Sequence, residues 1–237
     1  MMEKAYQKVI IKECQEPLLP IPLDIFTVAT PPPYEAKGAD YQGKSPYYLR
    51  EGVIEALIKA QEKLQQLQVG WRFYIFDAYR PISVQQFMVD YTFQWECEKR
   101  GLNPAHLTAV EKDGLLQEVY KIWAIPSHNP DTPPPHSTGG AIDLTLMDEN
   151  GNIIDMGGDI DEMSARAEPN YYLQFTEDIS SQKYQQRRDL LLTAMTYGGF
   201  KRHLGEWWHF CLGDQMWAWL SNSDHPYNQY YAIYGAI

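Results

Sequence analysis

The segment SHNPDTPPPHSTGG, residues 127–140, constrains the fold of this 237-residue chain more than any other. Proline has a fixed φ angle and no backbone N–H, so the run Pro133 to Pro135 excludes both a helix and a central strand. The glycines that end the segment, Gly139 and Gly140, allow the backbone to bend sharply. We therefore expect an irregular loop that separates two differently patterned parts of the chain.

The part of the chain before this loop has mainly helical patterns. Apolar residues recur at helical spacing from residue 48 onwards, at Leu49, Val53, Leu57, Ala60 and Leu64. Aromatic and β-branched residues predict a strand over 71–77. Helices are predicted over 82–99 and 115–125, with chain-breaking residues at 101–104 between them.

The part after the loop begins with a predicted strand over 141–148, which a turn at Asn150-Gly151 connects to a partner strand over 153–156. A helix over 181–197, a strand over 207–212 and a Trp-rich helical segment are expected to follow. Strands and helices alternate without a regular βαβ repeat. The pattern favours an α+β fold with a central antiparallel sheet flanked by helices.

We expect one domain over residues 1–237. Residues 15–48 are rich in Pro and Tyr and lack a sustained period. Residues 1–48 are therefore predicted to form an irregular arm packed on that domain, with a short strand near 25–28.

The charge and cysteine patterns exclude several classes of partner and site. The formal net charge is −11 and no run of Lys or Arg is present, which argues against nucleic acid or an anionic membrane as a partner. The three cysteines are far apart and form no CxxC pair, so no disulfide framework or zinc knuckle is suggested. No signal-peptide core or long apolar run is found, and a cytoplasmic location is expected.

Two of the six histidines lie in settings suited to a metal. His136 ends the Pro-rich run, and Asp143 follows seven residues later inside a predicted strand. His209 lies in another predicted strand, three residues after Glu206 and directly after two tryptophans. Two His and one carboxylate are a usual ligand set for one catalytic Zn²⁺ per chain, which leaves a position for water. Glu206 is then the candidate general base. Alternatively, these are hydrogen-bonded structural residues and the tryptophans belong to the core.

A third motif is Phe76-Asp77-Ala78-Tyr79-Arg80-Pro81. An Arg held at the end of a strand can direct its guanidinium into a cleft and bind a carboxylate or an oxyanion. A structural turn contact between Asp77 and Arg80 is the alternative.

Taken in order, DAYRP (77–81), HSTGGAID (136–143) and EWWH (206–209) resemble the zinc D-alanyl-D-alanine dipeptidases of the VanX type. More broadly, they are similar to the metallopeptidases that include D-alanyl-D-alanine carboxypeptidases and to hedgehog-like zinc domains. The resemblance implies an α+β fold, and His136, Asp143 and His209 as zinc ligands. It further implies Glu206 as the base, Arg80 as the group that stabilises the tetrahedral intermediate, and the small dipeptide D-Ala-D-Ala as the substrate.

The resemblance also bears on substrate binding. MGGDID (156–161) is similar to a family segment whose last Asp lies near the substrate amino group, which implies that role for Asp161; a solvated loop carboxylate is the alternative. Family members commonly have Ser two residues before the first His ligand, where this chain has Pro134. Ser137 is then a candidate to replace that substrate contact.

Two other functions are compatible with these motifs. One is a D,D- or L,D-carboxypeptidase acting on muropeptides, against which the missing export signal argues. The other is a non-catalytic zinc-binding module, against which Glu206 and Arg80 argue, because a structural zinc needs neither.

Overall fold

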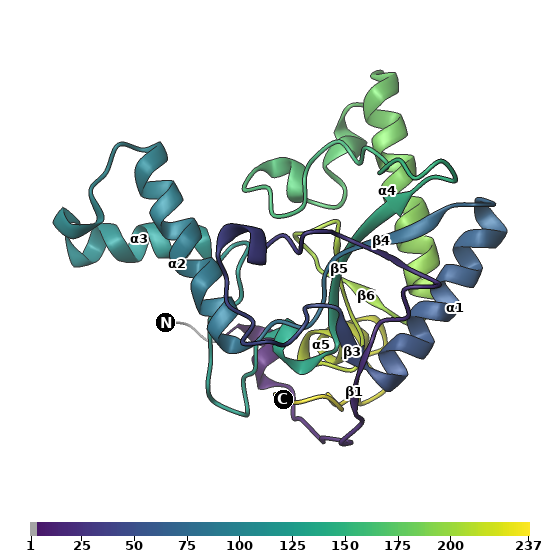
Figure 1. Cartoon of the computed structure of the whole chain (residues 1–237), viewed down its shortest axis with the longest axis horizontal. Coiled ribbons are helices and arrows are strands. Elements are labelled where there is room, and N and C mark those ends of the chain that lie inside the picture. The colour runs from purple at the N-terminus through teal and green to yellow at the C-terminus, as the bar shows by residue number, and fades with distance from the viewer. Residues whose placement is uncertain (1–3) are drawn as a thin grey trace.

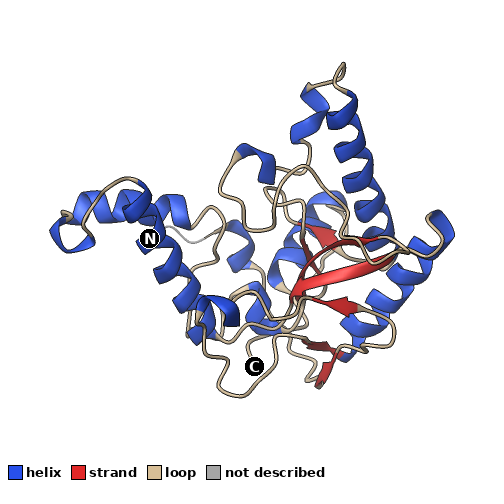
Figure 2. Ribbon diagram, turned by 45° about the horizontal axis from the view of Figure 1, so that its top comes forward, coloured by secondary structure: helices blue, strands red, loops and turns tan. Residues whose placement is uncertain are grey.

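The computed structural model describes residues 4–237, which form five α-helices and a central five-stranded sheet. The sheet has the order β2-β4-β5-β7-β6. Its strands are β2 (Thr27–Val28), β4 (Arg72–Asp77), β5 (Ala141–Met147), β7 (His209–Cys211) and β6 (Lys201–Arg202). A separate antiparallel pair joins β1 (Leu18–Pro20) to β3 (Tyr48–Arg50). Figure 2 shows the strands gathered at the centre with helices around them.

The α+β fold predicted from the sequence is confirmed, with one difference in the sheet. Strands β4, β5, β7 and β6 are antiparallel neighbours, but β2 pairs with β4 in parallel. β2 coincides with the short strand expected near residues 25–28, so the central sheet is mixed at one edge.

Helices α1 (Glu51–Leu67) and α4 (Ile179–Tyr197) lie side by side against the sheet (Figure 1). The apolar positions predicted from the helical period of α1 are fully buried in the main core, at Leu49, Val53, Leu57, Ala60 and Leu64. Gln61 ties α1 to β4, because its Oε1 accepts from Phe73 N at 2.8 Å and its Nε2 donates to Trp71 O at 3.1 Å.

Helices α2 (Ile82–Lys99) and α3 (Ala109–Val119) pack on each other and extend away from the sheet (Figure 1). α2 has the predicted bounds. α3 both starts and ends earlier than the predicted helix over 115–125. Thr108 caps its start: the Thr108 hydroxyl accepts from Glu111 N and the Glu111 carboxylate accepts from Thr108 N. The partner strand predicted over 153–156 is reduced to one bridge, Ile153 to Met147.

That hairpin ends early because the chain turns away at Gly157, which has a φ of +82°. The Asp155 carboxylate accepts from Gly157 N at 2.8 Å and stabilises the turn. The remaining elements are helix α5 (Gln215–Asp224) and six short 3₁₀ helices: η1 (Ala5–Lys8), η2 (Glu35–Lys37), η3 (Pro104–His106), η4 (Pro135–Thr138), η5 (Ala165–Ala167) and η6 (Tyr171–Gln174).

The first and last described segments of the chain are joined. Lys12 N donates to Ala232 O at 2.7 Å, and Gly235 N donates to the Glu13 carboxylate at 2.5 Å. Arg50 bridges the same region to the Pro-rich loop, because its guanidinium donates to the carbonyls of Glu16, Gly235 and Thr138. Among residues 4–237, no helix is long and apolar enough to cross a membrane.

Candidate metal centre

The sheet register places two of the predicted ligands opposite each other. Asp143 on β5 pairs directly with His209 on β7, so their side chains leave the same face of the sheet. His209 Nδ1 lies 3.0 Å from Asp143 Oδ1, and both residues are buried. On the other side of β5, strand β4 places Asp77 directly opposite Asp143.

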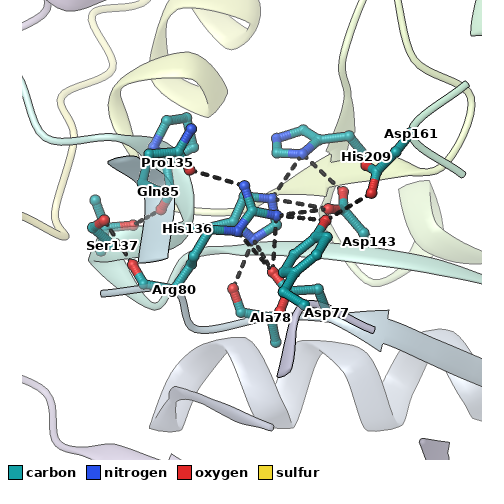
Figure 3. A network of polar contacts seen from close by, with 12 residues as sticks. Asp77, Ala78, Arg80, Gln85, Pro135, His136, Ser137, Asp143, Asp161 and His209 are labelled. Atoms are coloured by element: carbon teal, nitrogen blue, oxygen red, sulfur yellow. Dashed lines mark hydrogen bonds and ion pairs between the residues drawn. The ribbon is translucent and has the colours of Figure 1, made fainter. Parts of the chain in front are cut away.

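The third predicted ligand, His136, reaches the same point from η4. The return of the chain into β5 depends on Gly139, whose φ is +70° and where a Cβ atom would lie 2.6 Å from Leu18 Cδ1. His136 Nδ1 donates to Ala78 O at 2.6 Å, which orients the ring with Nε2 towards the cluster. Nε2 lies 3.2 Å from Asp143 Oδ2 and 3.1 Å from His209 Nδ1 (Figure 3).

The three side chains fit a divalent metal. One donor atom from each of His136, Asp143 and His209 lies within 4.8 Å of the others. Burial lowers the pKa of His209, which keeps its ring neutral. Burial acts to raise the pKa of Asp143, but the charge and hydrogen bond of His136 and the hydrogen bond of His209 outweigh it and lower that pKa. A neutral imidazole at His209 and an anionic carboxylate at Asp143 are protonation states that bind a metal.

Glu206 lies beside this cluster without belonging to it. Its Oε2 is 3.9 Å from His209 Nδ1, and its Oε1 is 3.6 Å from His203 Nδ1. The side chain is buried, and the pKa of its carboxyl is raised well above the usual value, first by burial and then by the charges of Asp143 and Asp161. A basic carboxylate next to a metal-binding cluster has the properties required of a proton acceptor.

Arg80 makes the turn contact with Asp77 that was the structural alternative, and it also lines the cavity. Its guanidinium pairs with Asp77 Oδ2 at 2.9 Å, and the same Nη2 lies 3.3 Å from Asp143 Oδ2. Nη1 donates to Gln85 Oε1 at 2.9 Å, and Nη2 donates to the Tyr34 hydroxyl at 3.0 Å. These contacts hold a buried positive charge in a fixed position beside the cluster (Figure 3).

Asp161 reaches the same cavity from the loop after β5. Its Oδ2 accepts from the Tyr34 hydroxyl at 3.0 Å, and its backbone has a φ of +64°. Burial, reinforced by the charge of Asp143, raises the pKa of Asp161 to about 7. The carboxyl therefore lies in the cavity wall instead of extending into solvent as a loop carboxylate.

Ser137, the candidate substrate contact, is placed differently from the other predicted site residues. Its side chain is only 2% exposed and does not line the cavity, and its hydroxyl donates to Arg80 O at 2.8 Å. η4 turns the side chain of Ser137 towards the DAYRP strand end while that of His136 faces the cluster. In this structure Ser137 is hydrogen-bonded to the backbone of Arg80, and its predicted contact with substrate stays a prediction.

All of the predicted ligands, Glu206, Arg80 and Asp161 line one narrow cavity of about 40 Å³. The sequence did not single out Tyr34, Gln85 or Lys4. Tyr34 and Trp123 stack on the Arg80 guanidinium, at 4.7 Å and 5.0 Å from its Cζ. Tyr34 lies in the arm that was expected to be irregular. Lys4 is far in sequence from most residues of the cavity wall, so no local spacing indicates either residue.

The part of the chain that carries the metal centre matches known proteins. A protein-family profile described as D-ala-D-ala dipeptidase matches residues 28–233. A D-alanyl-D-alanine dipeptidase of Synechocystis sp. is 50% identical over 99% of this chain and 97% of its own length. A D-alanyl-D-alanine dipeptidase of Enterococcus faecium is 31% identical over 69% of this chain and 72% of its own, and one of Escherichia coli is 50% identical over 32% of this chain and 37% of its own.

Proposed function

Because this chain belongs to the D-Ala-D-Ala dipeptidase family of peptidases, we propose that it hydrolyses the dipeptide D-Ala-D-Ala to two D-alanines at a zinc centre. The observation that carries this proposal is that Glu206 and Arg80 face the same cavity as the His136, Asp143 and His209 cluster. A purely structural metal site needs neither a basic carboxylate nor a buried guanidinium at its edge.

The proposed ligands of the zinc ion are His136 Nε2, an oxygen of Asp143 and His209 Nδ1. Two imidazoles and one carboxylate are a common catalytic zinc set, because they leave a position open for water. Bound there, zinc supplies a water of lowered pKa and polarises the substrate carbonyl.

The other residues have distinct proposed tasks. Glu206 accepts a proton from the attacking water and returns it to the leaving amine, a task that its raised pKa favours. Arg80 stabilises the negative charge that develops on the carbonyl oxygen, and its contacts with Asp77 and Gln85 hold it in place before the reaction begins.

Asp161 is proposed to bind the free ammonium of the dipeptide. A carboxylate in the wall of a narrow cavity favours a substrate whose amino end lies at that wall, and so disfavours longer chains. D-Ala-D-Ala is a precursor of peptidoglycan, so we also propose a role in cell-wall metabolism.

The experiment compares Glu206→Gln and Glu206→Ala with wild type, by measuring D-alanine release from D-Ala-D-Ala and zinc content in the same preparations. Loss of the base is expected to lower kcat by roughly 10²- to 10⁴-fold with zinc retained. Glu177→Gln is the matched control, because Glu177 is exposed and does not line the cavity. Wild-type protein that binds zinc but releases no D-alanine would contradict the proposal.

A further inference from the structure

Lys4 forms part of the cavity wall although it lies at the start of the described chain. It lines the cavity together with Glu206 and His203, and the charge of Lys4 acts on the pKa of both. Among residues 4–237, the one hydrogen bond of its ammonium runs from Nζ to Tyr120 O, at 3.2 Å. The Lys4 side chain is half-buried.

The position of Lys4 is fixed by the segment that follows it. Tyr6 is 6% exposed and packs with Met216 and Leu220 of α5. The Gln215 amide donates to the carbonyls of Gln7 and Val9, at 3.1 Å and 2.7 Å. η1 therefore packs against α5, as Figure 1 shows at the purple end of the chain. These contacts anchor the segment that carries Lys4 beside the cavity.

Within residues 4–237, the ammonium of Lys4 forms no ion pair. No carboxylate of the described residues lies within 4.0 Å of its Nζ, and burial lowers its pKa while Glu206 acts to raise it. An ammonium has three donors, and the Tyr120 carbonyl takes one. As far as the described residues are concerned, two donors therefore remain for a group that enters the cavity.

The other cations at the cavity are already paired. Arg80 is bound to Asp77, Tyr34 and Gln85. Lys121 donates to Glu118 at 2.6 Å, and its side chain is 66% exposed. Among the described residues that line this cavity, Lys4 is thus the cation that combines partial burial with unused donors.

We propose that Lys4 binds the terminal carboxylate of the substrate and so makes a free carboxylate a requirement for tight binding. This inference rests on the proposed function, because the dipeptide is a zwitterion with one charge at each end. Asp161 and Lys4 line the same cavity and carry opposite charges. Asp161 accepts a hydrogen bond from the Tyr34 hydroxyl, whereas Lys4 donates one to the Tyr120 carbonyl. The cavity then recognises both ends of a dipeptide and no interior segment of a longer chain.

The test compares D-Ala-D-Ala with D-alanyl-D-alaninamide, which lacks the carboxylate, in wild type and in Lys4→Ala. The KM of D-Ala-D-Ala is expected to rise by roughly 10- to 100-fold in Lys4→Ala with kcat little changed, as for loss of a hydrogen bond to a charged group. The amide is measured as a competitive inhibitor, so the readout does not require its cleavage. Its inhibition constant is expected to be the same in both proteins.

Two variants control for folding and charge. Lys4→Arg keeps the cation and is expected to restore most of the affinity, and Lys8→Ala removes an exposed lysine of the same segment and is expected to change nothing. Equal loss for the acid and the amide, or no loss for either, overturns the role of Lys4 while wild-type cleavage of D-Ala-D-Ala still supports the proposed function. Wild type that cleaves no dipeptide overturns both.

Discussion

Replacing Tyr34 by Phe removes one hydroxyl that connects the two charged groups of the cavity. The hydroxyl accepts from Arg80 Nη2 and donates to Asp161 Oδ2, each at 3.0 Å, and the ring is fully buried. Phe keeps the ring and its packing. Arg80 Nη2 still contacts Asp77 and Asp143, whereas Asp161 Oδ2 loses its hydrogen bond. The effect should therefore fall on Asp161.

The magnitude follows from the chemistry of that bond. Burial raises the pKa of Asp161 to about 7, and the Tyr34 hydroxyl acts to lower it. A hydrogen bond to a charged group contributes about 1.5–3 kcal/mol, which corresponds to a pKa increase of roughly one to two pH units when it is lost. At pH 7 the ionised fraction of Asp161 then falls from about one half to about 1–10%. If the carboxylate binds the substrate ammonium, kcat/KM should fall roughly 5- to 50-fold.

The assay measures kcat/KM for D-Ala-D-Ala between pH 6 and 8. Activity is expected to rise with pH in both proteins, with the rise displaced to higher pH in Tyr34→Phe. N-acetyl-D-Ala-D-Ala is the control substrate, because it carries no ammonium and its slow cleavage should not respond to the substitution. The reasoning is refuted if the pH dependence of the two proteins is the same, or if the acetylated dipeptide loses as much activity as the free one.

Two further predictions concern stability. Burial raises the pKa of Asp214 to about 6, so its stabilising contribution is fully present below about pH 4 and is lost as the pH rises through 6. Asp214→Asn keeps the acceptor for Trp217 N. The difference in unfolding free energy between this variant and wild type, measured by urea titration, should change by about 3 kcal/mol in favour of the variant from pH 4 to pH 7. A difference that does not depend on pH would contradict this. Leu57→Ala should lower the unfolding free energy by about 2–5 kcal/mol because the Leu57 side chain is fully buried. Leu67→Ala in the same helix, at a residue that is 39% exposed, should lower it by less than about 1 kcal/mol. Equal losses in the two variants would contradict the burial argument.

The sequence predicts best those elements that depend on local patterns. The bounds of α2 agree with the prediction, and the apolar period of α1 gives the residues that reach the core. The cluster of His136, Asp143 and His209 could be proposed because ligand chemistry, a flexible glycine and three motifs in order pointed to it. Its role in metal binding and catalysis stays a prediction until the variants are measured.

Features that depend on distant contacts could not be read from the sequence. The Tyr34 hydroxyl is hydrogen-bonded to both Arg80 and Asp161. Asp161 lies 127 residues after Tyr34, and nothing in the sequence near Tyr34 indicates this contact. The side chain of Ser137 faces Arg80 because of the 3₁₀ conformation of η4, which the run of prolines did not reveal. The start of α3 was missed although the Thr108 and Glu111 capping box is visible in the sequence.

The pairing of the first and last described segments has a consequence for the order of events during synthesis. Glu13 contacts Gly235 across 222 residues, and the segment that carries Lys4 is held by α5. A nascent chain that has emerged as far as residue 212 already contains every proposed zinc ligand, yet α5 and residues 232–235 are still to come. The cavity wall that carries Lys4 can therefore be completed only after α5 has been synthesised, and dipeptide recognition is expected to require the C-terminal part of the chain.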